Sequence, residues 1–261
     1  MTLSSLTPRA IVPVSALCTY LENREEAYDR YVLCKRPLPT SAMIQGDLEH
    51  MSRYFATEDL QKTYFTAKNE DELRNTYAII SDSVQRAIVE CERKYSYLGY
   101  DIEPMSGEIL NRLRIEEDIR VVAATNLMRD GVRGLNLVCQ LLPQQVELPL
   151  RSESYGLEGR LDALCFTGSA YFPVEYKTGR VPDGKPRLSH ELQLTAYCML
   201  LEENLQTVCH YGEIYYTRYF RRVPVFISDK AKDEVLEIRD KFLTTCTGSS
   251  ELVIGMGGFE I

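Results

Sequence analysis

The stretch Gly159–Gly179, GRLDALCFTGSAYFPVEYKTG, decides how this chain is expected to fold. Two runs rich in aliphatic and aromatic residues flank Thr167–Ala170, a short segment with Gly and Ser that is typical of a turn. The stretch therefore predicts a β-hairpin.

Side chains alternate between the two faces of a strand, so this hairpin separates its charged residues from its apolar ones. In the first strand Asp162 lies on the face opposite to the neighbouring apolar residues. In the second strand Glu175 and Lys177 share one face. If the turn has four residues, Phe166 pairs with Tyr171 and Asp162 lies opposite Glu175.

Two opposed carboxylates predict a metal site. Directly opposed side chains have Cβ atoms about 5 Å apart, where two like charges destabilise the pairing. Mg²⁺ or Mn²⁺ prefers oxygen ligands and keeps several waters, so Asp162 and Glu175 are enough to hold one ion. Lys177 would then orient an attacking water or stabilise the charge developing on a phosphate. The alternative is an ordinary surface hairpin, because an isolated Glu-x-Lys tripeptide is common.

Two other segments carry side chains suited to the same site. The segment His190–Glu203, HELQLTAYCMLLEE, predicts an amphipathic helix with Gln193 and Tyr197 one turn apart on one face. These side chains are placed to bind a phosphate or to hold the metal ligands, unless they form only a polar helix edge. His50 is one of three histidines, and its imidazole can complete a metal shell, although a lone histidine is more often structural.

The rest of the sequence predicts a helical first half and an α/β second half. Helical spacing of apolar residues covers 14–36, 41–56, 70–98 and 107–128, and the last helix carries Ile109, Leu113, Ile119, Val122 and Ala123. Later segments predict strands at 145–150, 156–166, 170–177, 213–220 and 223–227, a loop at 179–187, and helices at 189–203 and 230–244. We expect one compact unit with a mostly helical lobe, residues 1–135, and an α/β core, residues 136–261.

Composition is that of a globular protein, with 44% hydrophobic and 26% charged residues. No apolar tract is long enough to span a bilayer, and the first residues lack the pattern of a secretory signal. We therefore expect a cytoplasmic protein without membrane contacts, whose eight scattered cysteines are reduced thiols, several of them buried. The net charge of −8 argues against bulk electrostatic coating of nucleic acid but allows local contacts.

In their order along the chain, these motifs resemble the RecB-like branch of PD-(D/E)xK nucleases, most closely the CRISPR-associated RecB-like exonuclease family. The resemblance covers most of the chain, and four motifs in this order are specific to the RecB-like branch. The matching segments are the opening helix Val14–Leu33, the Gly-x-x-x-His helix Gly46–His50, the Gly-Arg-x-Asp strand Gly159–Asp162, the Glu-x-Lys strand Glu175–Lys177 and the Gln-x-x-x-Tyr helix Gln193–Tyr197.

The resemblance implies a restriction-endonuclease-like α/β core, a mixed central sheet flanked by helices, with an N-terminal helical lobe. The implied ligands of Mn²⁺ or Mg²⁺ are His50, Asp162, Glu175 and the carbonyl of Tyr176. The implied catalytic and supporting residues are Asp162, Glu175, the catalytic lysine Lys177, Gln193 and Tyr197.

The cysteines depart from this family. Its members hold an iron–sulfur cluster with one cysteine in the first helix and three near the C-terminus. Here Glu22 follows Tyr20-Leu21 where the first cysteine is expected, and residues 241–261 contain only Cys246. We predict no iron–sulfur cluster, either because this is a cluster-less relative or because a cysteine-rich tail is missing from the chain.

The expected function is hydrolysis of phosphodiester bonds in single-stranded or overhanging DNA. Such an exonuclease would process DNA ends for CRISPR spacer acquisition, with the CRISPR integrase complex as partner; additional endonuclease activity is left open. Basic residues expected to contact DNA, unless they form only a solvated loop and strand edge, are Arg180, Lys185, Arg187, Arg218, Arg221 and Arg222. Two other functions remain open: a DNA-end recognition module of the integrase complex with little nuclease role, and a recombination exonuclease of a virus or mobile element.

Overall fold

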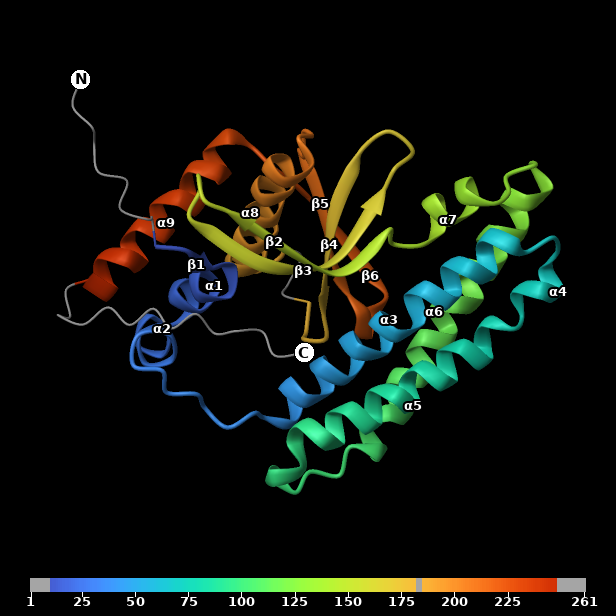
Figure 1. Cartoon of the computed structure of the whole chain (residues 1–261), viewed down its shortest axis with the longest axis horizontal. Coiled ribbons are helices and arrows are strands. Elements are labelled where there is room, and N and C mark those ends of the chain that lie inside the picture. Colours follow the sequence, from blue (N-terminus) through green and yellow to red (C-terminus); the bar gives the residue numbers. More distant parts are fainter. Residues whose placement is uncertain (1–9, 182–184, 248–261) are drawn as a thin grey trace.

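A six-stranded mixed sheet forms the centre of the structure, a computed structural model that describes residues 10–181 and 185–247 (Figure 1). The strand order is β1-β3-β4-β5-β6, with β2 paired to β3. Two neighbouring pairs, β1 with β3 and β4 with β5, are parallel, and the others are antiparallel. The strands are β1 (Val12–Pro13), β2 (Gln145–Ser152), β3 (Leu157–Phe166), β4 (Tyr171–Lys177), β5 (Tyr211–Tyr216) and β6 (Arg221–Phe226). The predicted mixed sheet is confirmed.

The hairpin of β3 and β4 has the predicted register. Phe166 pairs with Tyr171 across a four-residue turn. Within the turn Gly168 has a φ of 95°, a conformation that glycine adopts without steric cost. Counting back along the paired strands places Asp162 opposite Glu175, one position beyond the last paired residues.

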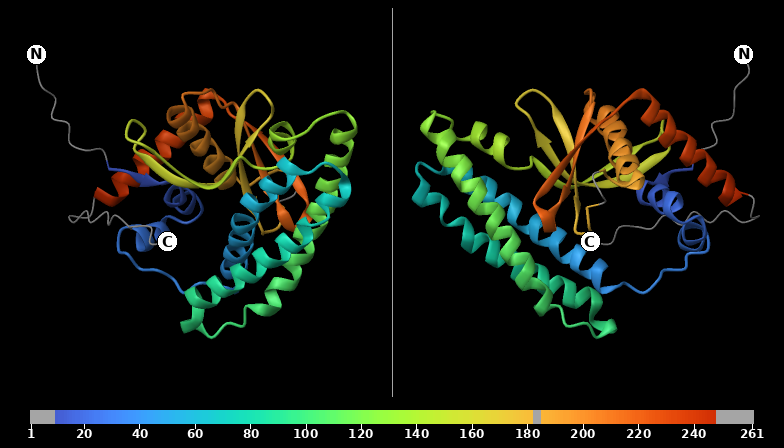
Figure 2. Two further views of the ribbon diagram at one scale, coloured as in Figure 1. Left: turned by 45° about the vertical axis from the view of Figure 1, so that its right-hand side comes forward. Right: turned by 180° about the vertical axis from the view of Figure 1, so that it is seen from behind.

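Three helices cover one face of the sheet: α1 (Val14–Glu22), α8 (Leu188–Leu205) and α9 (Asp229–Thr247). Figure 2 shows this layer on the side of the sheet opposite to the long helices of the first half. Helix α8 contacts β2, β3, β4 and β5. These contacts hold α8 against the strands that carry Asp162 and Glu175. The fully buried side chains of this core include Leu17, Leu157, Leu194, Ile214 and Tyr216.

The helix predicted over residues 14–36 is two helices, α1 and α2 (Arg24–Tyr31). Asn23 between them is extended, and its side chain accepts hydrogen bonds from the backbone N–H groups of Glu25 at 3.1 Å and Glu26 at 3.2 Å. This N-cap starts a new helix, which the apolar spacing alone did not predict. Because α1 packs against α8, this part of the predicted helical lobe lies with the sheet instead.

The other helices form a layer with its own hydrophobic core on the opposite side of the sheet (Figures 1 and 2). They are α3 (Ser41–Thr66), α4 (Glu70–Leu73), α5 (Thr76–Tyr95), α6 (Glu103–Arg129) and α7 (Leu135–Leu141). The helix predicted over 70–98 is interrupted between α4 and α5, and two short 3-10 helices cover Ser96–Leu98 and Thr217–Tyr219. Fully buried side chains of this core include Ile44, Leu48, Tyr64, Leu73, Ile109 and Leu137.

In its second half, helix α6 does not bury the residues that were predicted to be buried. Ile109 and Leu113 are buried as expected, but Ile119 is 61% exposed and Val122 is 62% exposed. The buried residues there are Val121, Ala124 and Met128. This helix carries two apolar stripes, and periodicity alone does not show which stripe meets the neighbouring helices.

A buried ionic network joins α3 to α6 and to the sheet. Glu49 accepts hydrogen bonds from Arg53 at 2.9 Å and from Arg112 at 2.7 Å. Arg53 also donates to Glu116 at 2.7 Å and lies 4.6 Å from the ring centroid of Tyr176 on β4. Because Arg53 is one turn beyond His50 on α3, the network fixes how His50 is presented to the sheet.

Within the described residues, no helix has the length and apolar character needed to cross a bilayer. All eight cysteines are free thiols, and the buried ones are Cys91, Cys198, Cys209 and Cys246. Residues 1–9, 182–184 and 248–261 lie outside the described residues. The structure therefore does not test the predictions that fall on them, which are the absence of an N-terminal signal, part of the loop at 179–187 and the C-terminal tail.

Candidate metal centre and active site

Asp162 lies on β3 with its carboxylate held from two sides. Its Oδ2 accepts a hydrogen bond from the backbone N–H of Tyr176 at 2.7 Å. Its Oδ1 lies 3.3 Å from Nδ1 of His50 on α3. The neighbouring strand therefore fixes one oxygen of this buried carboxylate, and the other faces an imidazole from the helical layer.

In Glu175 on β4 too, the protein holds one carboxylate oxygen, and it leaves the other without a hydrogen bond within the described part of the chain. Its Oε1 accepts hydrogen bonds from Nζ of Lys177 at 2.8 Å and from Nε2 of Gln193 at 2.6 Å. Its Oε2 is buried and has no hydrogen-bond partner among the described residues, in a side chain that belongs to a residue 3% exposed. Buried polar atoms are normally paired, so Oε2 is suited to a cation.

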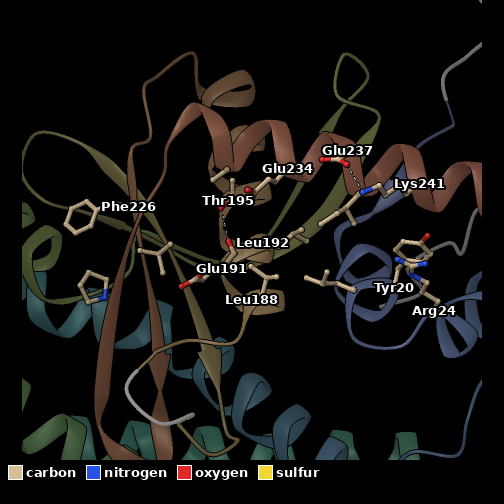
Figure 3. A pocket seen from close by; sticks show the side chains of 15 residues that line it. Tyr20, Arg24, Leu188, Glu191, Leu192, Thr195, Phe226, Glu234, Glu237 and Lys241 are labelled. Carbon is tan, nitrogen blue, oxygen red and sulfur yellow. Dashed lines mark hydrogen bonds and ion pairs between the residues drawn. The ribbon is translucent and has the colours of Figure 1, made fainter.

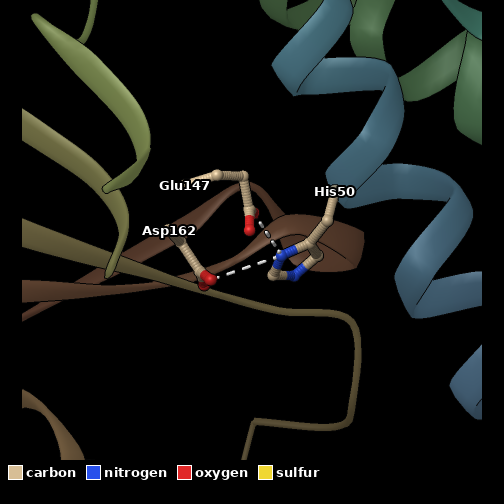
Figure 4. Close-up of side chains that lie close together, drawn as sticks. All are labelled: His50, Glu147 and Asp162. Carbon is tan, nitrogen blue, oxygen red and sulfur yellow. Dashed lines mark ion pairs between the residues drawn. The ribbon is translucent and has the colours of Figure 1, made fainter. Parts of the chain in front are cut away.

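A third acidic side chain, Glu147 on β2, joins this group (Figure 4). Its Oε1 lies 3.5 Å from Nδ1 of His50, the same atom that faces Asp162. The donor atoms of His50, Glu147 and Asp162 all lie within 4.8 Å of one another, close enough to share a metal ion. The sequence-based prediction did not include Glu147.

The position of Glu147 follows from how β2 pairs with β3. Val146 pairs with Ala163 and Leu148 with Leu161, so Glu147 lies across from Asp162. Glu147 has a φ of 52°, in the left-handed region that non-glycine residues rarely adopt. The only sequence signal was an acidic residue inside the apolar strand at 145–150, and that signal did not specify a register.

The donor set fits a small divalent cation. Two ligands at right angles around Mg²⁺, each about 2.1 Å from it, are about 3 Å apart. The separations of His50 Nδ1 from Asp162 Oδ1, 3.3 Å, and from Glu147 Oε1, 3.5 Å, are close to this value. Carboxylate oxygens suit hard divalent cations, and a neutral imidazole can complete a metal shell. The carbonyl of Tyr176 stays a predicted ligand.

The site groups shift one another's pKa values. Burial and then the Asp162 carboxylate raise the pKa of Glu175 to about 7. Burial opposes ionisation of Asp162, but the charges of His50 and Lys177 hold its pKa below the ordinary value. Burial also opposes the charged form of Lys177, and the Glu175 and Asp162 carboxylates outweigh it and raise the pKa. Lys177 is therefore an ammonium group at neutral pH.

The two helix residues predicted to support the site have different contacts. Oε1 of Gln193 accepts a hydrogen bond from Nζ of Lys177 at 2.9 Å, and Gln193 also donates to Glu175. The Tyr197 hydroxyl instead donates to the carbonyl oxygen of Arg160 at 2.7 Å. A Cβ at Gly159 would lie 2.8 Å from the Tyr197 ring, so glycine permits this close contact between α8 and β3. Gln193 therefore contacts the charged groups directly, and Tyr197 holds the strand that carries Asp162.

The basic residues predicted to bind DNA divide between the two faces of the sheet. Lys177 pairs with Tyr216, and Tyr216 with Arg221, so Arg221 shares the face of Lys177. Arg222 shares the opposite face, where it pairs with Glu213 at 2.8 Å. Arg221 is therefore the predicted basic residue of β6 that shares the face of Lys177 and Glu175.

The remaining predicted basic residues follow the site strand or lie near α3. Arg180, Lys185 and Arg187 are exposed in the segment between β4 and α8. Arg218 donates a hydrogen bond at 3.2 Å to Gln45, one residue before the Gly46–His50 motif. These residues therefore lie on the surface, in the segment that follows β4 and beside the N-terminal part of α3.

A hollow of about 700 Å³ lies on the other side of α8 (Figure 3). Leu188, Glu191 and Leu192 line it from α8, roughly opposite on the helix to Gln193 and Tyr197. Residues of α1, α2, β6 and α9 complete its lining. This hollow is separate from the metal centre.

The sequence of the chain also matches a known protein family, independently of the geometry of the site. The sequence pattern of the PD-(D/E)XK nuclease superfamily matches residues 26–237. This chain belongs to the PD-(D/E)XK nuclease superfamily. The superfamily match confirms the nuclease family and the restriction-endonuclease-like α/β fold predicted from the motifs.

One relative agrees with the narrower resemblance to CRISPR-associated enzymes. The CRISPR-associated exonuclease Csa1 of Saccharolobus solfataricus is 28% identical over 211 residues, which cover 76% of this PD-(D/E)XK chain and 65% of the relative. The chain thus spans less than two thirds of the length of this relative. A solved structure described as the crystal structure of SSO0001 has 19% sequence identity and a TM-score of 0.31, covering 60% of this chain and 69% of that chain.

Proposed function

We propose that this chain is a metal-dependent deoxyribonuclease that hydrolyses phosphodiester bonds in single-stranded or overhanging DNA. The observation that carries the proposal is the arrangement of Asp162 and Glu175. Each carboxylate has one oxygen anchored by the protein, and the remaining oxygens face His50 or have no partner. The family of nucleases to which the chain belongs supports this use of the site.

His50, Asp162 and Glu175 would hold Mn²⁺ or Mg²⁺, with the carbonyl of Tyr176 as a further ligand. When bound, the cation supplies Lewis-acid polarisation of the phosphate and lowers the pKa of a bound water. The backbone N–H of Tyr176 and the pair of Lys177 and Gln193 keep the two carboxylates in place from the protein side.

Lys177 stabilises charge on the phosphate instead of accepting a proton. Its raised pKa keeps it protonated at neutral pH, because Glu175 and Asp162 outweigh the effect of burial. A fixed ammonium in a partly desolvated site stabilises negative charge that develops in the transition state. Gln193 directs this ammonium group by accepting its hydrogen bond.

Single-stranded or overhanging DNA is the substrate that we infer from the resemblance of the motifs. Arg187, Arg218 and Arg221 would contact its phosphates near the site, so binding would weaken with salt. The relative described as a CRISPR-associated exonuclease supports an exonuclease role in a CRISPR setting. From the resemblance of the motifs, we further propose that this chain processes DNA ends for spacer acquisition, with the integrase complex as partner.

End-labelled DNA tests the nuclease proposal. Wild-type protein is expected to shorten single-stranded and overhanging DNA with Mn²⁺ or Mg²⁺ and to leave it intact with EDTA. Asp162→Asn and Lys177→Ala are expected to lower the rate by about 10² to 10³, the range observed when one electrostatic stabiliser is removed. Glu153→Gln, which changes a carboxylate whose side chain is 68% exposed, is the matched control.

Retention of wild-type cleavage by both site variants would exclude this active site. If Asp162→Asn and Lys177→Ala lack cleavage but still pull down the integrase and support spacer acquisition as wild type does, the chain acts as a DNA-end recognition module.

A further inference from the structure

We infer that Glu147 is an additional ligand of the cation held by His50 and Asp162. This inference rests on the proposed function, because it concerns the same metal centre. It goes beyond the motif residues, since no motif of the chain includes Glu147. The observations that lead to it are the convergence of Glu147 on the metal-binding face of His50, the register of β2 and the charge of the site.

Glu147 and Asp162 approach the same nitrogen atom. Nδ1 of His50 lies 3.5 Å from Oε1 of Glu147 and 3.3 Å from Oδ1 of Asp162 (Figure 4). A neutral imidazole has one donor and one acceptor nitrogen, so a single Nδ1 does not satisfy two carboxylates. A divalent cation close to Nδ1 binds both carboxylates and the imidazole together.

A second observation comes from the other strand. Glu175, opposite Asp162 in the hairpin register, has a buried Oε2 without a hydrogen-bond partner and is 3% exposed. Asp162 on β3 therefore lies between Glu147 on β2 and Glu175 on β4, and both neighbouring strands add an acidic side chain next to it.

The formal charge of the site is negative only when Glu147 is included. The carboxylates Glu147, Asp162 and Glu175 face two cationic groups, Lys177 and, 3.9 Å from Glu147, Arg160. With neutral His50 these groups sum to −1, and without Glu147 they sum to zero. A bound cation offsets the excess negative charge that Glu147 adds.

The alternative role for Glu147 is a structural ion pair with a protonated His50. Oε2 of Glu147 lies 3.9 Å from Arg160, and that contact serves either role. The two roles differ in what they do to the bound ion. Loss of a ligand lowers the affinity for Mn²⁺ and lets a water take the empty position, whereas loss of an ion pair that only orients His50 lowers the affinity without adding a water.

Titration of the full-length chain with Mn²⁺, with free Mn²⁺ followed by electron paramagnetic resonance and no DNA present, measures the affinity. Water-proton relaxation measures the waters on the bound ion, and an added water in the Glu147 variants identifies a ligand. Glu147→Gln keeps the shape and removes the charge, and is expected to raise the dissociation constant about 10- to 100-fold. Glu147→Gly removes the ligand entirely, and is expected to raise it at least as much. Glycine suits the φ of 52° at this position, so the second variant stays folded.

Glu58→Gln is the matched control, because Glu58 lies on α3 near the site and its side chain is 79% exposed. It is expected to bind Mn²⁺ as wild type does. If both Glu147 variants bind Mn²⁺ within twofold of wild type while Asp162→Asn does not bind it, Glu147 is not a ligand and the proposed nuclease centre stands. If Asp162→Asn also binds as wild type does, the metal centre itself is wrong.

Discussion

At the scale of single residues, His190 shows how the site affects a neighbour that does not bind metal. Its Nδ1 lies 3.1 Å from the hydroxyl oxygen of Tyr216. Burial, followed by the charges of Lys177 and Arg187, lowers the pKa of His190 to about 4. In the unfolded chain a histidine has a pKa near 6.5. Folding therefore keeps His190 neutral at pH values where the unfolded chain is protonated.

Stability is expected to fall as pH decreases from about 6.5 to about 4, because only the unfolded state takes up this proton. His190→Gln removes the titrating group and can retain a hydrogen bond to Tyr216. The variant is expected to lose less stability between pH 7 and pH 4.5 than wild type, by on the order of 1 kcal/mol after screening by solvent. Urea denaturation at the two pH values measures the difference.

His210→Gln is the control for this experiment, since His210 is exposed. It should show the same loss of stability with acid as wild type. An equal loss in wild type and in His190→Gln would mean that the protonated imidazole is accommodated in the folded protein.

Residues whose placement depends on local rules could be predicted from the sequence. The turn and the alternation of side chains place Asp162 opposite Glu175, and helical spacing puts Gln193 on the face of α8 that reaches them. Glu147 depends on how β2 pairs with β3 and on a positive φ. No local propensity specifies either feature, so this residue could be found only in the structure.

At the scale of elements, α3 is held against the sheet by buried charges. Arg53 is 9% exposed and bonds to Glu49 and Glu116, while its guanidinium lies over Tyr176. Arg53→Ala would leave two buried carboxylates with fewer partners. It is expected to lower the free energy of unfolding by about 3–5 kcal/mol, the usual cost of breaking a buried ion pair. Urea or thermal denaturation measures this loss.

Lys62→Ala on the same helix is the matched control, because Lys62 pairs with Glu58 while 64% exposed. Exposed pairs contribute less than about 1 kcal/mol. Similar small losses in the two variants would show that the Arg53 network contributes little to stability.

Element boundaries were less predictable than element types. Asn23 ends one helix and caps the next, and the apolar residues around it continue a helical period without a visible break. In α6 both stripes of apolar residues have helical spacing, so only the neighbouring helices determine that Val121 is buried and Val122 is exposed. These features depend on tertiary contacts, which single-sequence patterns do not contain.

At the scale of the whole molecule, the residues of the proposed metal centre come from two layers that have separate hydrophobic cores. His50 comes from α3 in the helical layer, whereas Glu147, Asp162 and Glu175 come from three strands of the sheet. An ion bound by residues from both layers stabilises the arrangement in which the layers are together. The ligands are far apart in sequence, so the unfolded chain does not offer the same site.

Mn²⁺ is therefore expected to stabilise the folded protein as a whole. At a concentration one hundred times its dissociation constant, it should raise the free energy of unfolding by about 2.7 kcal/mol relative to EDTA. His50→Ala removes the ligand from the helical layer, and a tenfold weaker site would lower this increment by about 1.4 kcal/mol at the same Mn²⁺ concentration. His210→Ala changes an exposed histidine that is not a predicted ligand, and it should retain the full increment. Urea denaturation with Mn²⁺ and with EDTA measures each increment. An equal increment in His50→Ala and wild type would show that the ion is held by the sheet alone, and that the helical layer does not take part in binding it.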